Sequence, residues 1–138
     1  MIRMPGWEDR LNAVVQFAHT RQFKLGEWDC LRFACAACEA VTGVDYWPRF
    51  AGYETEIEYL RKIKKLAKSY DDAITLVTGI TPCLPTMARR GDVVTYRGED
   101  GKVCLGVSVG PSVLMLTETG VTEIEITSPA LINAWRLG

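Results

Sequence analysis

Cys30 is the residue whose position best suits chemistry, because it directly follows a residue that caps helices. Asp29 is a preferred N-terminal cap, and Gly43 is of the type that best ends a helix in the left-handed conformation. Residues 31–41 between them are therefore predicted to be helical. Unpaired N–H groups and the positive end of the helix dipole gather at a helix start and favour a thiolate. The pattern thus predicts the site of a cysteine nucleophile at Cys30.

A cysteine nucleophile usually works with a histidine base, and the chain has one histidine. His19 lies at the edge of the apolar stripe of an amphipathic helix expected over residues 7–21, four residues after Val15. A single histidine at the edge of a helix is typical of a partly exposed structural residue. The pattern therefore favours a structural role for His19 over that of a general base.

The five cysteines raise the alternatives of a metal site and a disulfide framework. An odd number without an export signal argues against the disulfide framework. The C-x4-C-x2-C spacing matches the start of a plant-type ferredoxin motif, but its last two cysteines fall in an Ala-rich, helix-prone segment. They are predicted to be small buried hydrophobes, with no metal and no cofactor. The metal-binding alternative would use Cys30, Cys35, Cys38 and Cys83 or Cys104.

Composition limits the class of protein. A chain of 138 residues, 48% hydrophobic and 24% charged, predicts one globular domain over residues 1–138. The net charge of −1 and the lack of a basic block exclude an electrostatic footprint for nucleic acid. No apolar run reaches the roughly 20 residues of a membrane span, and the N-terminus lacks a signal peptide's apolar middle. We therefore expect a soluble protein made in the cytoplasm, with neither nucleic acid nor membrane as partner.

The helical half is predicted over residues 1–80. A second amphipathic helix is expected over residues 55–68, and a short helix over residues 73–78, capped by Asp71-Asp72 and ended by Gly79. The inward face of the 55–68 helix is predicted to consist of Ile57, Leu60, Ile63 and Ala67.

An aromatic-rich segment, residues 45–53, interrupts the helices. Pro48 and Gly52 are expected to prevent a regular element there. Its aromatic side chains either cap an edge of the core or form an exposed surface that binds a partner. These side chains are Tyr46, Trp47, Phe50 and Tyr53.

The sheet half is predicted over residues 88–138. Turn signals separate strands expected at 93–96, 103–109, 113–117 and 121–126, and a last short element follows at 129–134. Helices first and an antiparallel meander second indicate an α+β fold, with N-terminal helices packed on one face of a C-terminal antiparallel sheet. If strand 121–126 lies at an edge, it is a second surface for a partner.

The order of several short motifs resembles a known family. The Gly-x-x-Asp-Cys start at 26–30, the Arg-Arg-Gly-Asp-Val-Val run at 89–94 and a Leu-Gly-Val-x-Val-Gly strand at 105–110 resemble the NlpC-like branch of papain-fold cysteine peptidases, which cut peptidoglycan peptides. The chain is more similar still to small proteins of bacteriophage tail modules. Those proteins share a Thr-Gly-x-Asp after the helix, here 42–45, and a terminal Ala-Trp-Arg, here 134–136.

The resemblance implies a catalytic set that this chain lacks in part. The family uses a cysteine thiolate, a histidine on the second core strand and a polar residue on the third strand. Cys30 matches the nucleophile, but Cys104 stands where the histidine would be, and Thr117 is the nearest candidate for the third group. Two thiols at the former catalytic positions could form a disulfide or bind a metal.

The resemblance together with the missing histidine implies a pseudoenzyme. The expected function is a structural or assembly component of a phage tail, at the tail tip or baseplate, located in the virion after synthesis in the host cytoplasm. Its expected partners are other tail proteins, with transient contact to peptidoglycan. One alternative is an active peptidoglycan-cleaving cysteine hydrolase with Cys30 as nucleophile, and another is a cysteine-ligated metal-binding module.

Overall fold

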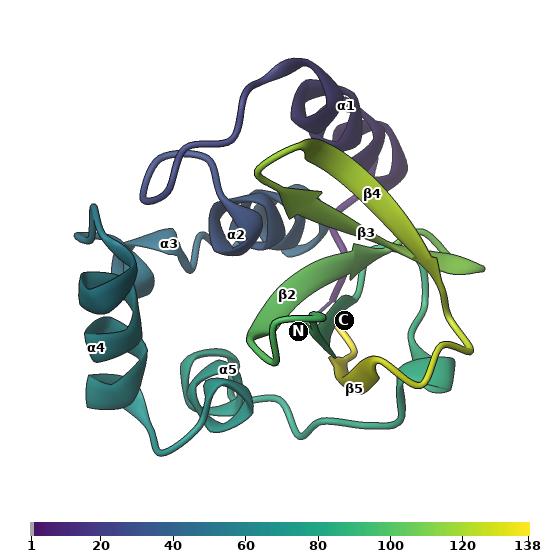
Figure 1. Ribbon diagram of the computed structural model, residues 1–138. Helices are drawn as coiled ribbons and strands as arrows, with labels where there is room; N and C mark the ends of the chain where they lie inside the picture. The colour runs from purple at the N-terminus through teal and green to yellow at the C-terminus, as the bar shows by residue number, and fades with distance from the viewer. Residues whose placement is uncertain (1) are drawn as a thin grey trace.

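The computed structural model describes residues 2–138 and has helices first and a sheet second (Figure 1). These residues form five α-helices, one 3-10 turn and five strands, which confirms the predicted α+β class. The helices are α1 (Trp7–Thr20), α2 (Cys30–Thr42), α3 (Trp47–Phe50), α4 (Glu56–Leu66) and α5 (Tyr70–Thr78), followed by the turn η1 (Pro85–Met87). The strands are β1 (Val93–Arg97), β2 (Val103–Ser108), β3 (Ser112–Thr117), β4 (Gly120–Glu125) and β5 (Leu131–Trp135).

The five strands form one antiparallel sheet in the order β4-β3-β2-β1-β5. Strands β1 to β4 are the predicted meander. The last element, expected as a short piece without an assigned partner, is a strand that pairs with β1, with Val93 opposite Trp135. Strand β5 therefore covers the side of β1 that β2 leaves free.

Helix α2 forms the centre of the core (Figure 1). Its side chains Phe33, Ala37 and Val41 have no exposed surface, and the main buried cluster also contains Leu105 and Val107 of β2. Ala-rich composition lets the helix approach closely, and complete burial of such apolar side chains is the main favourable term in folding. The predicted central position of this helix is confirmed.

Helix α4 turns a different face inward from the predicted one. Ile57 and Leu60 keep 64% and 53% of their surface exposed, whereas Ile63 is buried and Ala67 is partly buried against the main core. The partly buried Tyr59 and Leu66 complete the inward face. The prediction failed because α4 lies at the periphery of the fold (Figure 1), where contacts with α5 and Tyr53 determine which face is covered.

The aromatic segment also differs from its prediction. Residues Trp47–Phe50 form the short helix α3, and Pro48 lies in its first turn, where proline is tolerated. Tyr46, Phe50 and Tyr53 are buried, and Trp47 is half-buried. Of the two alternatives for these aromatic side chains, the structure therefore supports packing against the core and not an exposed surface.

Helix α5 begins one turn earlier than predicted. Its cap is Ser69, whose Oγ accepts a hydrogen bond of 3.0 Å from the N–H of Asp72. Asp71 instead accepts hydrogen bonds from Thr95 of β1 and Asn133 of β5. The acidic pair therefore belongs to the first turn of the helix, and one of its members joins α5 to the sheet.

Candidate functional site

The start of α2 is built around Asp29, as predicted. Its Oδ1 accepts a hydrogen bond of 2.8 Å from the N–H of Arg32, and its Oδ2 accepts one of 2.9 Å from the N–H of Gly26. The hydroxyl of Tyr53 donates a further hydrogen bond to Oδ2. With 2% of its surface exposed, this carboxylate caps the helix from inside the protein and ties it to the aromatic segment.

Gly26 is required by the close approach of that aromatic segment. Its φ is +85°, and a Cβ atom built on it would lie 2.1 Å from the carbonyl oxygen of Tyr53. No side chain fits in that space. The fold thus requires a glycine at this position of the Gly-x-x-Asp-Cys motif, whether or not Cys30 is reactive.

The structure brings the two predicted thiol positions together. Cys30 is the first residue of α2, and its side chain interacts with that of Cys104 on β2 closely enough to shift the pKa of both thiols. Tyr96 lies opposite Cys104 in the β1–β2 ladder, and its side chain also lowers the pKa of the Cys104 thiol. Both cysteines are free. The site is therefore a pair of thiols at the junction between a helix start and the sheet.

The two thiols differ in acidity. The interaction with Cys104 raises the pKa of Cys30 well above its usual range, and burial and the Asp29 carboxylate raise it further. The interactions with Cys30 and Tyr96 lower the pKa of Cys104, although burial opposes them. A helix start favours the anion, but here the neighbouring Cys104, burial and the Asp29 carboxylate outweigh it. The structure thus gives no support to a thiolate at Cys30.

Three tyrosine side chains, from the aromatic segment, α4 and α5, pack next to one another beside the thiol pair. The ring centroids of Tyr53 and Tyr59 are 4.9 Å apart, and those of Tyr59 and Tyr70 are 6.2 Å apart. The hydroxyl oxygens of Tyr59 and Tyr70 are buried, and neither forms a well-aligned hydrogen bond with the described residues. Burial, followed by the electrostatic influence of other groups that include Cys30, raises the pKa of both phenols. Two buried hydroxyl groups therefore lie beside the thiol pair, within an otherwise apolar part of the core.

Three further tyrosines border the thiol pair and were not predicted as site residues: Tyr59, Tyr70 and Tyr96. A signal existed for Tyr96, because a hairpin turn centred on Asp100 places it opposite Cys104. No comparable signal existed for Tyr59 and Tyr70, which reach the site from α4 and α5 through contacts that are distant in sequence.

Thr117, the candidate for the third catalytic position, makes its hydrogen bonds elsewhere. Its hydroxyl donates to the carbonyl oxygen of Gly120 at 2.9 Å and accepts from the N–H of Thr119 at 3.4 Å. These bonds stabilise the turn between β3 and β4. Thr117 therefore does not orient a partner for Cys30.

His19 is exposed in the last turn of α1 and is not among the main groups that set the pKa of Cys30. This position agrees with a structural role and gives the thiol no imidazole base.

The residues named for the metal alternative do not form a ligand set. Within residues 2–138, no group of three or more His, Cys, Asp or Glu side chains is placed to hold a metal ion. Cys35 and Cys38 are buried within α2, where burial raises the pKa of Cys38 to about 12. Cys83 bridges to Ala134 of β5 through its backbone. Cys35 and Cys38 act as small buried side chains, as predicted.

Fold and site together define an α+β protein in which Cys30 and Cys104 form a pair of neighbouring thiols. The family described as Domain of unknown function (DUF6950) matches residues 2–137, so the chain belongs to this family. A search of curated proteins gave no match. Among the described residues, no helix has both the length and the apolar character needed to cross a membrane.

Proposed function

We propose that this chain is a non-hydrolytic structural or assembly component of a bacteriophage tail, built on a degenerate NlpC-like peptidase fold. The motif order supports the tail assignment, and the contact between Cys30 and Cys104 supports the loss of hydrolysis. In this proposal the chain works at the tail tip or baseplate of the virion. Its partners are other tail proteins, and any contact with peptidoglycan is transient.

Peptide cleavage by a thiol requires a nucleophilic thiolate and a proton for the leaving amine. A positioned acid or base contributes about two to four orders of magnitude to such a step. Cys30 keeps its proton because Cys104 is the more acidic thiol of the pair, and no imidazole is among the groups that set the pKa of Cys30. The site therefore lacks the group that would activate Cys30 and protonate the leaving amine.

The hydrolase alternative is tested by measuring peptide release from purified peptidoglycan. We expect the wild-type protein and the Cys30→Ala variant to give the same background release. Release by the wild-type protein that disappears in Cys30→Ala would overturn the proposal and establish Cys30 as a nucleophile.

The tail assignment needs a separate test. We expect the chain, co-expressed with tail-tip proteins from the same genome, to co-elute with at least one of them in size-exclusion chromatography. Separate elution from every tail protein, together with absence from purified tails and assembly intermediates, would contradict the tail assignment whatever the outcome of the peptidoglycan assay.

A further inference from the structure

One edge of the sheet is covered by another segment, and the opposite edge is open. The outer edge of β5 is covered, because Cys83 and Ala134 exchange two backbone hydrogen bonds of 2.8 and 2.9 Å. Within residues 2–138, no segment pairs with the outer edge of β4. Exposed edges are costly because they invite pairing with other chains, and proteins usually block them. Covering one edge and leaving the other open makes β4 a candidate surface for strand addition.

The backbone of β4 presents its free groups in a regular row. The N–H of Ile126 donates to the carbonyl oxygen of Pro111, and Ile124 lies opposite Val113 in the same register. In an antiparallel ladder, bonded residues alternate with residues whose N–H and C=O point the other way. Residues 121, 123 and 125 therefore direct their N–H groups toward the open edge. The carbonyls of 121 and 123 point there too, whereas that of Glu125 accepts from Ser128.

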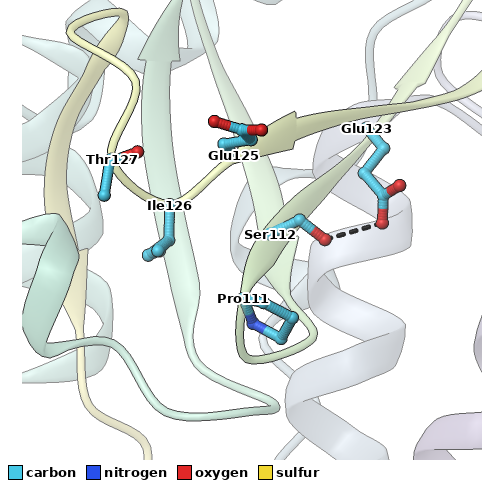
Figure 2. A pocket seen from close by; sticks show the side chains of 6 residues that line it. All are labelled: Pro111, Ser112, Glu123, Glu125, Ile126 and Thr127. Carbon is cyan, nitrogen blue, oxygen red and sulfur yellow. Dashed lines mark hydrogen bonds between the residues drawn. The ribbon is translucent and has the colours of Figure 1, made fainter.

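The open edge is acidic. Glu123 and Glu125 are exposed and two residues apart, so their side chains lie on the same face of the strand. Figure 2 shows both beside a surface hollow, where the hydroxyl of Ser112 donates to Oε2 of Glu123 at 2.6 Å. Neither carboxylate forms an ion pair with another described residue. An added strand with cations at alternate positions would neutralise both.

We propose that the β4 edge binds an extended segment of another protein that carries Lys or Arg at two alternate positions. Main-chain hydrogen bonds to residues 121, 123 and 125 would provide affinity, and the two glutamates would select the basic strand. A second copy of this chain is the poorer occupant. Antiparallel pairing of two β4 strands about a two-fold axis would bring the same two glutamates of both copies close together, and like charges in cross-strand positions are destabilising. This inference does not depend on the tail assignment.

A synthetic nonapeptide that alternates Lys with Thr or Val is a suitable probe. We expect its binding, measured by fluorescence anisotropy, to weaken as salt is added and to fall at least about tenfold in the Glu123→Gln/Glu125→Gln variant. The control variant Glu39→Gln/Glu99→Gln removes the same charge from exposed sites and should bind as the wild type does. No binding by the wild type, or equal loss in both variants, would overturn the proposal, since the glutamates would then only block the edge or attract cations non-specifically.

Backbone methylation separates strand addition from simple charge attraction. In an antiparallel pair, the peptide residues opposite Glu123 and Glu125 direct their own N–H groups at β4, so N-methylation of the Lys amides should abolish binding. N-methylation of the intervening amides should leave binding intact; the reverse result would indicate parallel pairing and still support the edge. Equal binding of the two methylated peptides would contradict strand addition. A dimer of the wild-type chain in light scattering that Glu123→Lys abolishes would assign the edge to a second copy and also overturn the proposal.

Discussion

Nη2 of Arg3 lies 2.8 Å from Oδ1 of Asp92, a carboxylate with no exposed surface. The same carboxylate accepts hydrogen bonds from the N–H groups of Arg89 and Leu137, and Nε of Arg3 donates to the carbonyl oxygen of Leu137. Asp92 thus joins the first and last described segments to the start of the sheet. The Arg-Arg-Gly-Asp motif has a structural explanation in this network.

Replacing Asp92 with Asn should destabilise the protein by about 3 kcal/mol, because it leaves the partly buried Arg3 cation without its partner. Chemical denaturation measures this free energy of unfolding. The control Glu99→Gln changes an exposed side chain and should stay within about 0.5 kcal/mol of the wild type. An Asp92→Asn variant as stable as this control would show that the network contributes little.

Stability should fall as the pH rises above about 9. Burial raises the pKa of Cys38 to about 12, and the pKa values of Cys30 and Cys35 are also raised. Between the ordinary thiol pKa and the raised one, the unfolded chain binds fewer protons than the folded chain, so its release of protons favours unfolding. Each such thiol contributes a slope of about −1.4 kcal/mol per pH unit.

Unfolding curves measured from pH 8 to 11 test this slope. The Cys38→Ala variant should lose its share of the pH dependence, whatever its stability at pH 7. Above pH 10 the slope should steepen, because burial raises the pKa values of Tyr53, Tyr59, Tyr70 and Tyr96 as well. A stability that stays constant from pH 8 to 11 would contradict the burial of these groups.

The thiol pair should react in a defined order. Iodoacetamide at neutral pH should modify Cys104 before Cys30, because interactions with Cys30 and Tyr96 lower the pKa of Cys104 while that of Cys30 is raised. Peptide mapping by mass spectrometry gives both rates. Tyr96→Phe should slow the modification of Cys104, and Tyr46→Phe serves as the matched control. Faster reaction at Cys30 would reverse the assignment of the more acidic thiol.

Substitutions at two glycines distinguish the cost of backbone strain from the cost of a steric clash at the start of α2. Gly26 and Gly101 have φ values of +85° and +81°, but a Cβ atom has no neighbour within 4 Å at Gly101 and would lie 2.1 Å from a carbonyl oxygen at Gly26. Gly101→Ala should cost about 1 kcal/mol from strain alone. Gly26→Ala should cost at least about 2 kcal/mol more. Equal costs in thermal or chemical unfolding would show that the segment around Tyr53 moves freely.

Local signals in the sequence predicted local structure well. Asp29 caps α2, Gly43 ends it, and Gly79 ends α5, as predicted. These features depend on residues within one turn of each other. Ser69 shows the limit, because Ser and Asp are both good caps and the sequence alone did not distinguish them.

Contacts between distant segments were harder to predict. The spacing of apolar residues correctly predicted that α4 is amphipathic. It predicted that the face with Ile57 and Leu60 points inward, but the fold buries the face with Tyr59 and Ile63. The same limit applies to the candidate site. Motif order indicated that Cys30 and Cys104 correspond to one centre, whereas the acidity of each thiol depends on burial and on tyrosines from other elements. Burial is a property of the folded chain, so the helix start alone gave the wrong direction for Cys30.

The pairing of β5 with β1 has a consequence for synthesis on the ribosome. A nascent chain can form the β1–β4 meander from neighbouring segments, but β1 stays unpaired on its other side until residues 131–135, about 40 residues later, have emerged. Leu137, which donates to Asp92, emerges later still. We therefore expect the sheet to be completed only after residues 131–135 have emerged, and a ribosome stalled before residue 131 to display a chain whose strand β1 is open and aggregation-prone.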